Sequence, residues 1–230
     1  MKPLESLRIK IFADGADIDT MLRLNDDPLI KGLTTNPSLM RKSGIKDYRA
    51  FAKEVLAVVK NKPISFEVFA DDLQEMERQA REISSWGENV YVKIPITNSL
   101  GESTVIIVKS LAEDAIKVNV TAVLTHDQAV SSRGVIPQNV DSIISIFNGR
   151  IMDTGEEPIP PPRFFDNCDY LWASCREPYN IYQAEDLDYD IITVPEAILT
   201  KARQFQGYDL DKLSLETVRQ FKKDSEGYTL

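Results

Sequence analysis

The chain has 230 residues, of which 43% are hydrophobic and 27% charged, so it can bury a core of the size of one large domain. Its formal net charge of −9 would repel polyanions, which argues against a nucleic-acid or anionic-membrane surface. The sequence shows neither a signal-peptide core nor an apolar run long enough to span a membrane, so we expect a cytoplasmic protein. Cys168 and Cys175 are expected to be reduced thiols.

Short runs rich in β-branched residues recur along the chain, with helix-capable segments between them. In order, these runs cover residues 8–13, 30–35, 64–70, 89–96, 118–124, 142–147, 169–175 and 190–195. Apolar residues at helical spacing predict helices over 47–60, 72–86 and 102–114. Eight alternations of strand and helix predict an α/β fold, namely a single (β/α)8 TIM barrel that comprises residues 1–230.

Two predicted connections are irregular, residues 133–142 after the fifth strand and residues 152–167 after the sixth. Four prolines within residues 158–162 forbid a continuous helix there. We therefore expect a shortened or irregular helical layer after strand 6. Beyond about residue 210, apolar residues at helical spacing predict a C-terminal amphipathic helix.

Polar side chains fall on the inward face of several predicted strands. In the fourth strand Val90, Val92 and Ile94 share one face, so Tyr91 and Lys93 lie on the other, and Lys93 should point into the barrel. Further polar residues lie towards the carboxyl ends of their strands: Asp14, Thr34, Asn36, Glu67, Asn119, Thr121, Ser174 and Arg176. Because barrel active sites are built at that end, these groups should converge on one mouth.

The inward lysine has two interpretations. Any one of these polar residues could be a satisfied core group or a strand-end residue that reaches solvent. Burying a lone ammonium is costly, however, and six strands would have to make the same exception independently. We therefore interpret Lys93 as a nucleophilic amine, whose neutral fraction can attack a ketone.

Several motifs resemble the transaldolase and fructose-6-phosphate aldolase family of class I aldolases. They are FADGAD at 12–17, GLTTNPSL at 32–39, VKIPIT at 92–97, VNVTAVLTHDQA at 118–129, SIFNGRIMDTG at 145–155 and ASCREP at 173–178. The resemblance implies a barrel in which Lys93 forms a Schiff base and Asp14 is the general acid/base. It also implies that Glu67 and Thr121 hold a catalytic water, and that the chemistry needs neither a metal nor a cofactor.

The same resemblance implies how a sugar phosphate is held. The hydroxyls of a dihydroxyacetone unit would be bound by Thr34, Asn36 and Asn119. The terminal phosphate would be gripped by Ser145, Arg150, Ser174 and Arg176. A guanidinium supplies paired donors that match phosphate oxygens, although Arg176 could instead form a surface ion pair with Glu177 or Asp186.

Two substrate-site positions favour transfer over simple cleavage. The aldolase branch of the family carries glutamine where Glu67 stands and tyrosine where Phe147 stands. The resemblance therefore favours a transaldolase of the pentose phosphate pathway, which moves a dihydroxyacetone unit between sugar phosphates. Fructose-6-phosphate aldolase-like cleavage and a non-catalytic sugar-phosphate-binding barrel stay open, as does a homo-oligomer.

Other polar residues in the motifs are expected to be structural. A metal-dependent aldolase is disfavoured because its site generally needs several histidines, and His126 is the only one in the chain. We expect His126 at the start of the helix after the fifth strand. Ser38 is expected to cap the helix that follows TTNPS.

Overall fold

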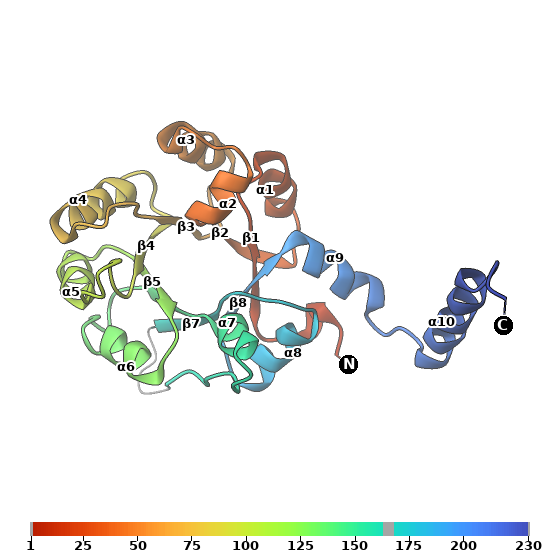
Figure 1. Ribbon diagram of the computed structural model, residues 1–230. Coiled ribbons are helices and arrows are strands. Elements are labelled where there is room, and N and C mark those ends of the chain that lie inside the picture. The colour runs from red at the N-terminus through yellow and green to blue at the C-terminus, as the bar shows by residue number, and fades with distance from the viewer. Residues whose placement is uncertain (1, 163–167, 230) are drawn as a thin grey trace.

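The computed structural model describes residues 2–162 and 168–229, and within them eight parallel strands close into a barrel in chain order (Figure 1). The strands are β1 Lys10–Asp14, β2 Ile30–Thr34, β3 Ile64–Glu67, β4 Val90–Pro95, β5 Val118–Val123, β6 Ser142–Ile146, β7 Cys168–Trp172 and β8 Ile191–Pro195. Each strand pairs with the next, and β8 pairs with β1. The eight predicted strands and the predicted fold class are confirmed.

Helices surround the barrel, except for the last one, α10, as Figure 1 shows. They are η1 Leu4–Ser6, α1 Ile18–Asn25, α2 Pro37–Lys42, α3 Tyr48–Val58, α4 Leu73–Ser84, α5 Val105–Glu113, α6 His126–Gly134, α7 Asn148–Asp153, α8 Tyr179–Asp186, α9 Glu196–Phe205 and α10 Leu210–Asp224. Several begin at an aspartate whose side chain accepts a hydrogen bond from the first turn: Asp17, Asp47 and Asp72 cap α1, α3 and α4. Such caps fix where each helix starts after the loop at the strand's carboxyl end.

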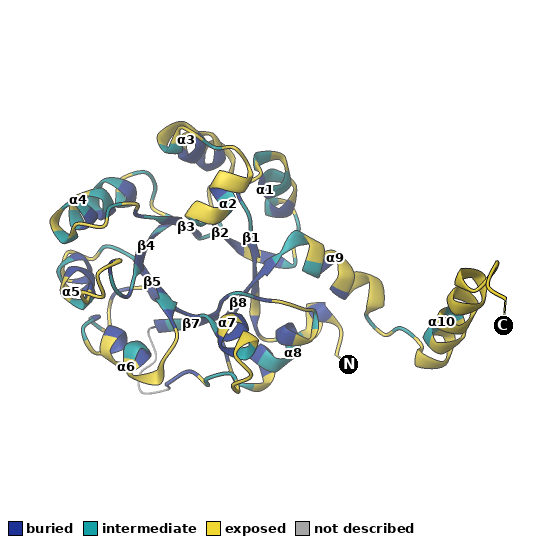
Figure 2. Ribbon diagram, viewed as in Figure 1, coloured by how far each residue is buried: buried dark blue, intermediate teal, exposed yellow. Residues whose placement is uncertain are grey.

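The barrel interior has an apolar floor. Phe12, Ile143, Leu171 and Ile191 pack together inside it, and Tyr91 packs against them. A Cβ on Gly32 would lie 2.4 Å from Phe12 Cζ, so only glycine leaves room for that ring. Alternate residues on the other strand face pack against the helices in the main core, dark blue in Figure 2. The floor therefore closes the barrel below the polar side chains at its carboxyl end.

The helical layer after β6 is short and irregular, as predicted. Helix α7 has six residues, and residues 156–162 that follow it are irregular. The Asn148 side chain is fully buried and holds this segment: its Oδ1 accepts from Ile159 N at 2.9 Å, and its Nδ2 donates to Tyr189 Oη at 2.8 Å. The remainder of the irregular stretch, residues 163–167, lies outside the described residues.

The predicted C-terminal amphipathic helix is present as α10 and stands apart from the barrel (Figures 1 and 2). None of its described residues is buried, and Leu215, Val218 and Phe221 are 49%, 59% and 67% exposed. Its apolar face therefore has no partner within the described chain. Across residues 2–162 and 168–229, no helix combines the length and hydrophobicity that a membrane crossing needs.

Candidate active site

Lys93 lies at the centre of the barrel mouth. Its side chain points inward from β4, as predicted, and the residue is only 6% exposed. Lys93 Nζ lies 3.2 Å from Glu67 Oε2 and donates to Thr35 O at 3.0 Å. Glu67 and Lys93 are register partners on adjacent strands, which brings the two side chains together. The buried amine is thus next to a carboxylate that can accept its proton.

Asp14 ends β1 on the same side of the barrel. Its Oδ1 accepts a hydrogen bond of 2.9 Å from the Thr34 hydroxyl, which also bonds the Thr193 hydroxyl on β8. Burial raises the pKa of the Asp14 carboxyl above its ordinary value, against the opposing effects of the Lys93 charge and the Thr34 hydrogen bond. An acid whose pKa is raised towards neutrality is suited to taking and returning a proton.

Asn119 forms a buried polar chain beside Lys93. Its Oδ1 accepts from Ser145 Oγ at 2.7 Å, and its Nδ2 donates to Ser65 Oγ at 3.0 Å. All three residues are buried, and Asn119 is the register partner of Lys93 on β5. These two bonds fix the orientation of the amide, so that its remaining hydrogen-bonding capacity has a defined direction.

Thr121 offers a buried hydroxyl that is not used by the fold. Thr121 is 2% exposed, and its Oγ1 has no hydrogen-bond partner among the described residues. It precedes Ala122, whose φ of 58° coincides with an irregular register between β5 and β6. An unpaired buried hydroxyl is costly, which marks this position as one that a ligand or water would satisfy.

Three of the predicted phosphate-binding residues lie close to the carboxyl ends of β6 and β7: Arg150 belongs to α7, and Ser174 and Arg176 belong to the loop after β7. Arg150 is exposed and places its guanidinium carbon 5.1 Å from the centre of the Phe147 ring. Ser174 has a left-handed φ of 66°. A Cβ on Gly149 would lie 1.6 Å from Ser174 O, so the first turn of α7 packs directly on Ser174. Ser145, in contrast, lies deeper and bonds Asn119.

Arg176 forms a surface ion pair, but not with either acid expected from the sequence. Its Nε lies 3.1 Å from Oδ2 of Asp153, at the end of α7, rather than pairing with Glu177 or Asp186. The prediction named sequence neighbours, whereas the fold brings α7 against the loop after β7. Both side chains are about half exposed, 49% and 52%, so the pair is weak and a phosphate could compete for the guanidinium.

Two residues that were expected to be structural, Ser38 and His126, have outcomes that differ. Asn36, not Ser38, caps α2, because its Oδ1 accepts from Leu39 N at 3.0 Å. The prediction for Ser38 was therefore wrong. The cap uses one acceptor position of Asn36 Oδ1, so the amide N–H donors of Asn36 stay available to a substrate. His126 is exposed and begins α6, as predicted.

The sequence reasoning missed some residues of the site. Ser65 bonds Asn119, and Thr193 bonds Thr34. Each lies two residues from another inward residue of its strand, Ser65 from Glu67 and Thr193 from Ile191, and so shares its face. Strand periodicity could have identified these two. Tyr48, which contacts Glu67 from α3, carries no signal of this kind because it belongs to a helix.

Comparisons with known proteins place the chain in one family. Residues 11–229 match the family model described as Transaldolase/Fructose-6-phosphate aldolase. A "Probable transaldolase" of Nitrosopumilus maritimus is 31% identical over 95% of this chain and 95% of its own length. Proteins with the same description from Methanococcus maripaludis and Brucella anthropi are 33% and 35% identical, over 84% and 83% of this chain and 89% and 87% of their own.

The fold is also similar to solved structures of other chemistry. A crystal structure of 2,3-dimethylmalate lyase, a member of the PEP mutase/isocitrate lyase superfamily, aligns with a TM-score of 0.53 at 15% identity. The alignment covers 93% of this chain and 86% of that one. At this identity the likeness concerns the barrel alone.

Proposed function

The chain belongs to the transaldolase/fructose-6-phosphate aldolase family, and we propose that it is a transaldolase that transfers a dihydroxyacetone unit between sugar phosphates through a Schiff base on Lys93. The observation that carries the proposal is the buried Lys93 amine, held 3.2 Å from the Glu67 carboxylate at the mouth of the barrel. The names of the relatives support transfer, and the family supports aldolase-type chemistry.

Schiff-base formation would begin when Lys93 passes a proton to Glu67 and its neutral amine attacks the ketone carbon of the donor. The carbinolamine then loses its hydroxyl group as water, and an iminium ion forms on Nζ. Glu67 and the free Thr121 hydroxyl would hold the water that carries protons in this step and in the later hydrolysis.

Carbon–carbon cleavage would use Asp14 as the base. The Asp14 carboxylate takes the proton of the donor's C4 hydroxyl, the C3–C4 bond breaks, and its electron pair moves to the iminium nitrogen to give an enamine. The first aldose leaves, and the enamine carbon attacks the aldehyde of the acceptor while Asp14 returns the proton to the new alkoxide. The raised pKa of Asp14 supports this two-way role.

The remaining site residues would hold the substrate. We propose that Thr34, Asn36 and Asn119 bind the dihydroxyacetone hydroxyls, and that Arg150, Ser174, Arg176 and Ser145 bind the phosphate. Arg150 has no ion-pair partner among the described residues, which leaves its guanidinium available. Local cations of this kind can bind an anion despite the net charge of −9.

The choice between transferase and aldolase is tested by acceptor dependence. Fructose 6-phosphate is supplied with and without erythrose 4-phosphate, and release of glyceraldehyde 3-phosphate is followed with a coupled dehydrogenase. We expect sustained release only with the acceptor, because the enamine must be kept from protonation until an aldose arrives. The Glu67→Gln, Phe147→Tyr double variant should lose this dependence. Equal rates with and without acceptor in the wild type would instead assign fructose-6-phosphate aldolase activity.

A further inference from the structure

The backbone of Glu67 lies beyond the last pairing between its strand and β2. The strands β2 and β3 pair through Leu33 with Ile64 and Thr34 with Ser65. Ile64 N and Val68 N donate to backbone oxygens on the β4 side. Successive residues of a strand direct their backbone groups to alternate sides, so Glu67, which comes directly before Val68, directs its N–H and C=O towards β2. Because β2 has ended there, the ladder supplies no partner for either group.

A side chain from α3 takes the place of the missing strand. The Tyr48 hydroxyl accepts a hydrogen bond of 2.7 Å from Glu67 N and donates one of 3.1 Å to Glu67 O. One hydroxyl thus satisfies both backbone groups of the residue whose carboxylate contacts Lys93 Nζ. The direction of the Glu67 side chain depends on the backbone that these two bonds hold.

Aromatic packing holds Tyr48 in place. Its ring lies 4.4 Å from that of Phe69, 5.9 Å from that of Phe66 and 5.3 Å from that of Trp86, measured between ring centres. Burial raises the pKa of Tyr48 well above its ordinary value, so the hydroxyl stays protonated and can keep donating across the working pH range. A rigid ring with a constantly protonated hydroxyl is suited to fixing a backbone.

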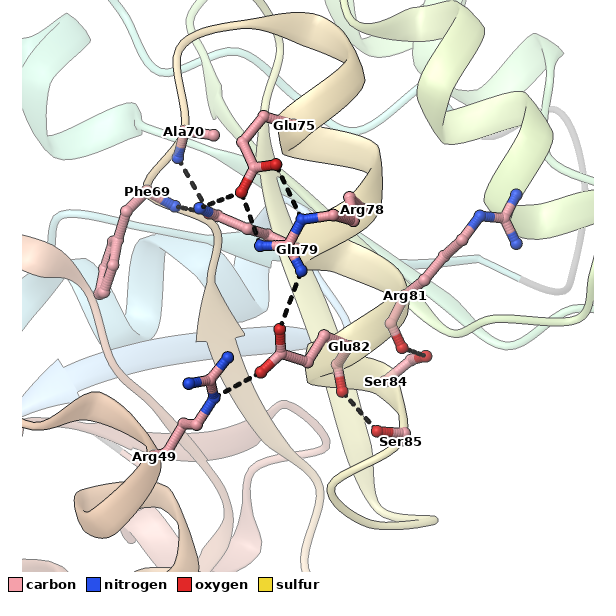
Figure 3. A network of polar contacts seen from close by, with 10 residues as sticks. All are labelled: Arg49, Phe69, Ala70, Glu75, Arg78, Gln79, Arg81, Glu82, Ser84 and Ser85. Atoms are coloured by element: carbon pink, nitrogen blue, oxygen red, sulfur yellow. Dashed lines mark hydrogen bonds and ion pairs between the residues drawn. The ribbon is translucent and has the colours of Figure 1, made fainter.

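The turn after Glu67 is held from the other side by α4, as Figure 3 shows. Gln79 Oε1 accepts hydrogen bonds from Phe69 N and Ala70 N at 2.9 and 3.0 Å. Arg49 of α3 bonds Glu82 of α4, so an ion pair links the two helices that hold this turn. The carboxyl end of β3 is therefore held between α3 and α4.

We propose that Tyr48 is a positioning residue for the aldol reaction, which sets the Glu67 carboxylate against Lys93 Nζ through the Glu67 backbone. This inference rests on the proposed function, since Glu67 accepts the Lys93 proton and holds the water in that scheme. Removing the hydroxyl leaves two backbone groups without partners at the strand end, and a shift of even 1 Å in a catalytic group can lower a rate about 10²-fold.

The test is Tyr48→Phe, which deletes the hydroxyl and retains the packed ring. We expect kcat to fall about 10- to 100-fold with little change in the KM for fructose 6-phosphate, because the proposed phosphate-binding residues lie on β6, on α7 and in the loop after β7, away from β3. In a Glu67→Gln background the same substitution should cause little further loss, since residues that act as a unit are not additive. Full additivity, or an unchanged kcat in Tyr48→Phe, would contradict the proposal.

Tyr170→Phe is the matched control, because the Tyr170 hydroxyl is also buried and donates to a backbone carbonyl, that of Pro162, at 2.9 Å. Both variants should lose similar stability, but only Tyr48→Phe should lose turnover. A crystal structure of Tyr48→Phe tests the positioning without turnover: we expect the Glu67 carboxylate to have left Lys93. An unmoved carboxylate overturns the role of Tyr48 alone, whereas a wild type with no Schiff-base adduct overturns the proposed function.

Discussion

The Asp14 carboxyl lies inside the barrel, where burial disfavours its ionised form. Burial raises its pKa, although the Lys93 charge and the Thr34 hydroxyl favour the anion. A group with a raised folded-state pKa contributes stability that is fully present below its unfolded-state pKa and is lost as the pH rises through the folded-state pKa. Asp14 therefore destabilises the fold at neutral pH, as is common for a residue selected for chemistry.

The variant Asp14→Asn tests this electrostatic cost. Because asparagine resembles the protonated acid, the variant should unfold at a higher temperature than the wild type at neutral pH, and the difference should vanish below the ordinary aspartate pKa. Its turnover should fall about 10²- to 10⁴-fold with loss of the acid/base. Melting curves across pH measure the first effect. If the variant is less stable than the wild type at neutral pH, the assigned pKa direction is wrong.

Asp17→Asn supplies a control of opposite sign. Hydrogen bonds from Thr20 at the start of α1 lower the pKa of Asp17, so its contribution to stability is present above the unfolded-state pKa and is lost as the pH falls through the folded-state pKa. This variant should be less stable than the wild type at neutral pH, with the difference shrinking in acid.

Residues on strands could be predicted from the sequence, and residues that act across elements could not. The alternation of side chains along β4 predicted that Lys93 points into the barrel, and the same alternation along β3 predicted an inward Glu67. Tyr48 reaches Glu67 only because α3 packs beside β3, and Arg176 reaches Asp153 only because α7 packs beside the loop after β7. Such contacts depend on how elements pack, which local periodicity does not encode.

At the scale of elements, the short helix α7 organises the proposed phosphate side. It carries Arg150 at its middle and Asp153 at its end, and its first turn packs on Ser174. The helix ends where Gly155 adopts a left-handed φ of 89°, and the prolines that follow keep a helix from resuming, which was predictable from composition. The hydrogen bond from Ile159 N to Asn148 Oδ1 could not be predicted, because it joins residues that share no periodic pattern.

We predict that Arg150→Ala weakens use of phosphorylated donors far more than use of free dihydroxyacetone, by about 10- to 100-fold in kcat/KM, because it removes a charge-assisted contact. A second prediction concerns Asp153→Asn, which should lower the KM for phosphorylated donors, since it releases Arg176 from its ion pair. Steady-state kinetics with phosphorylated donors and with free dihydroxyacetone measure the effects of both variants. Equal losses for both donors in Arg150→Ala would assign that residue a structural role.

At the scale of the whole molecule, the barrel separates a structural floor from a polar mouth. Strand alternation predicted the polar mouth but not the apolar floor, and the closed barrel confirms the predicted fold class. The homo-oligomer stays a prediction, which the exposed apolar face of α10 favours. Analytical ultracentrifugation would measure the mass of the particle in solution. The mouth itself supports one central claim, which is that Lys93 forms a covalent imine with a ketose.

Borohydride trapping tests that claim most directly. The protein is incubated with fructose 6-phosphate and sodium borohydride, and the modified peptide is identified by mass spectrometry. The account predicts a reduced adduct on Lys93 of the wild type, and none in a folded Lys93→Met variant, whose thioether fills similar volume but cannot form an imine. A wild type that turns the sugar over without any adduct at Lys93, or a Lys93→Met variant that retains turnover, would contradict it.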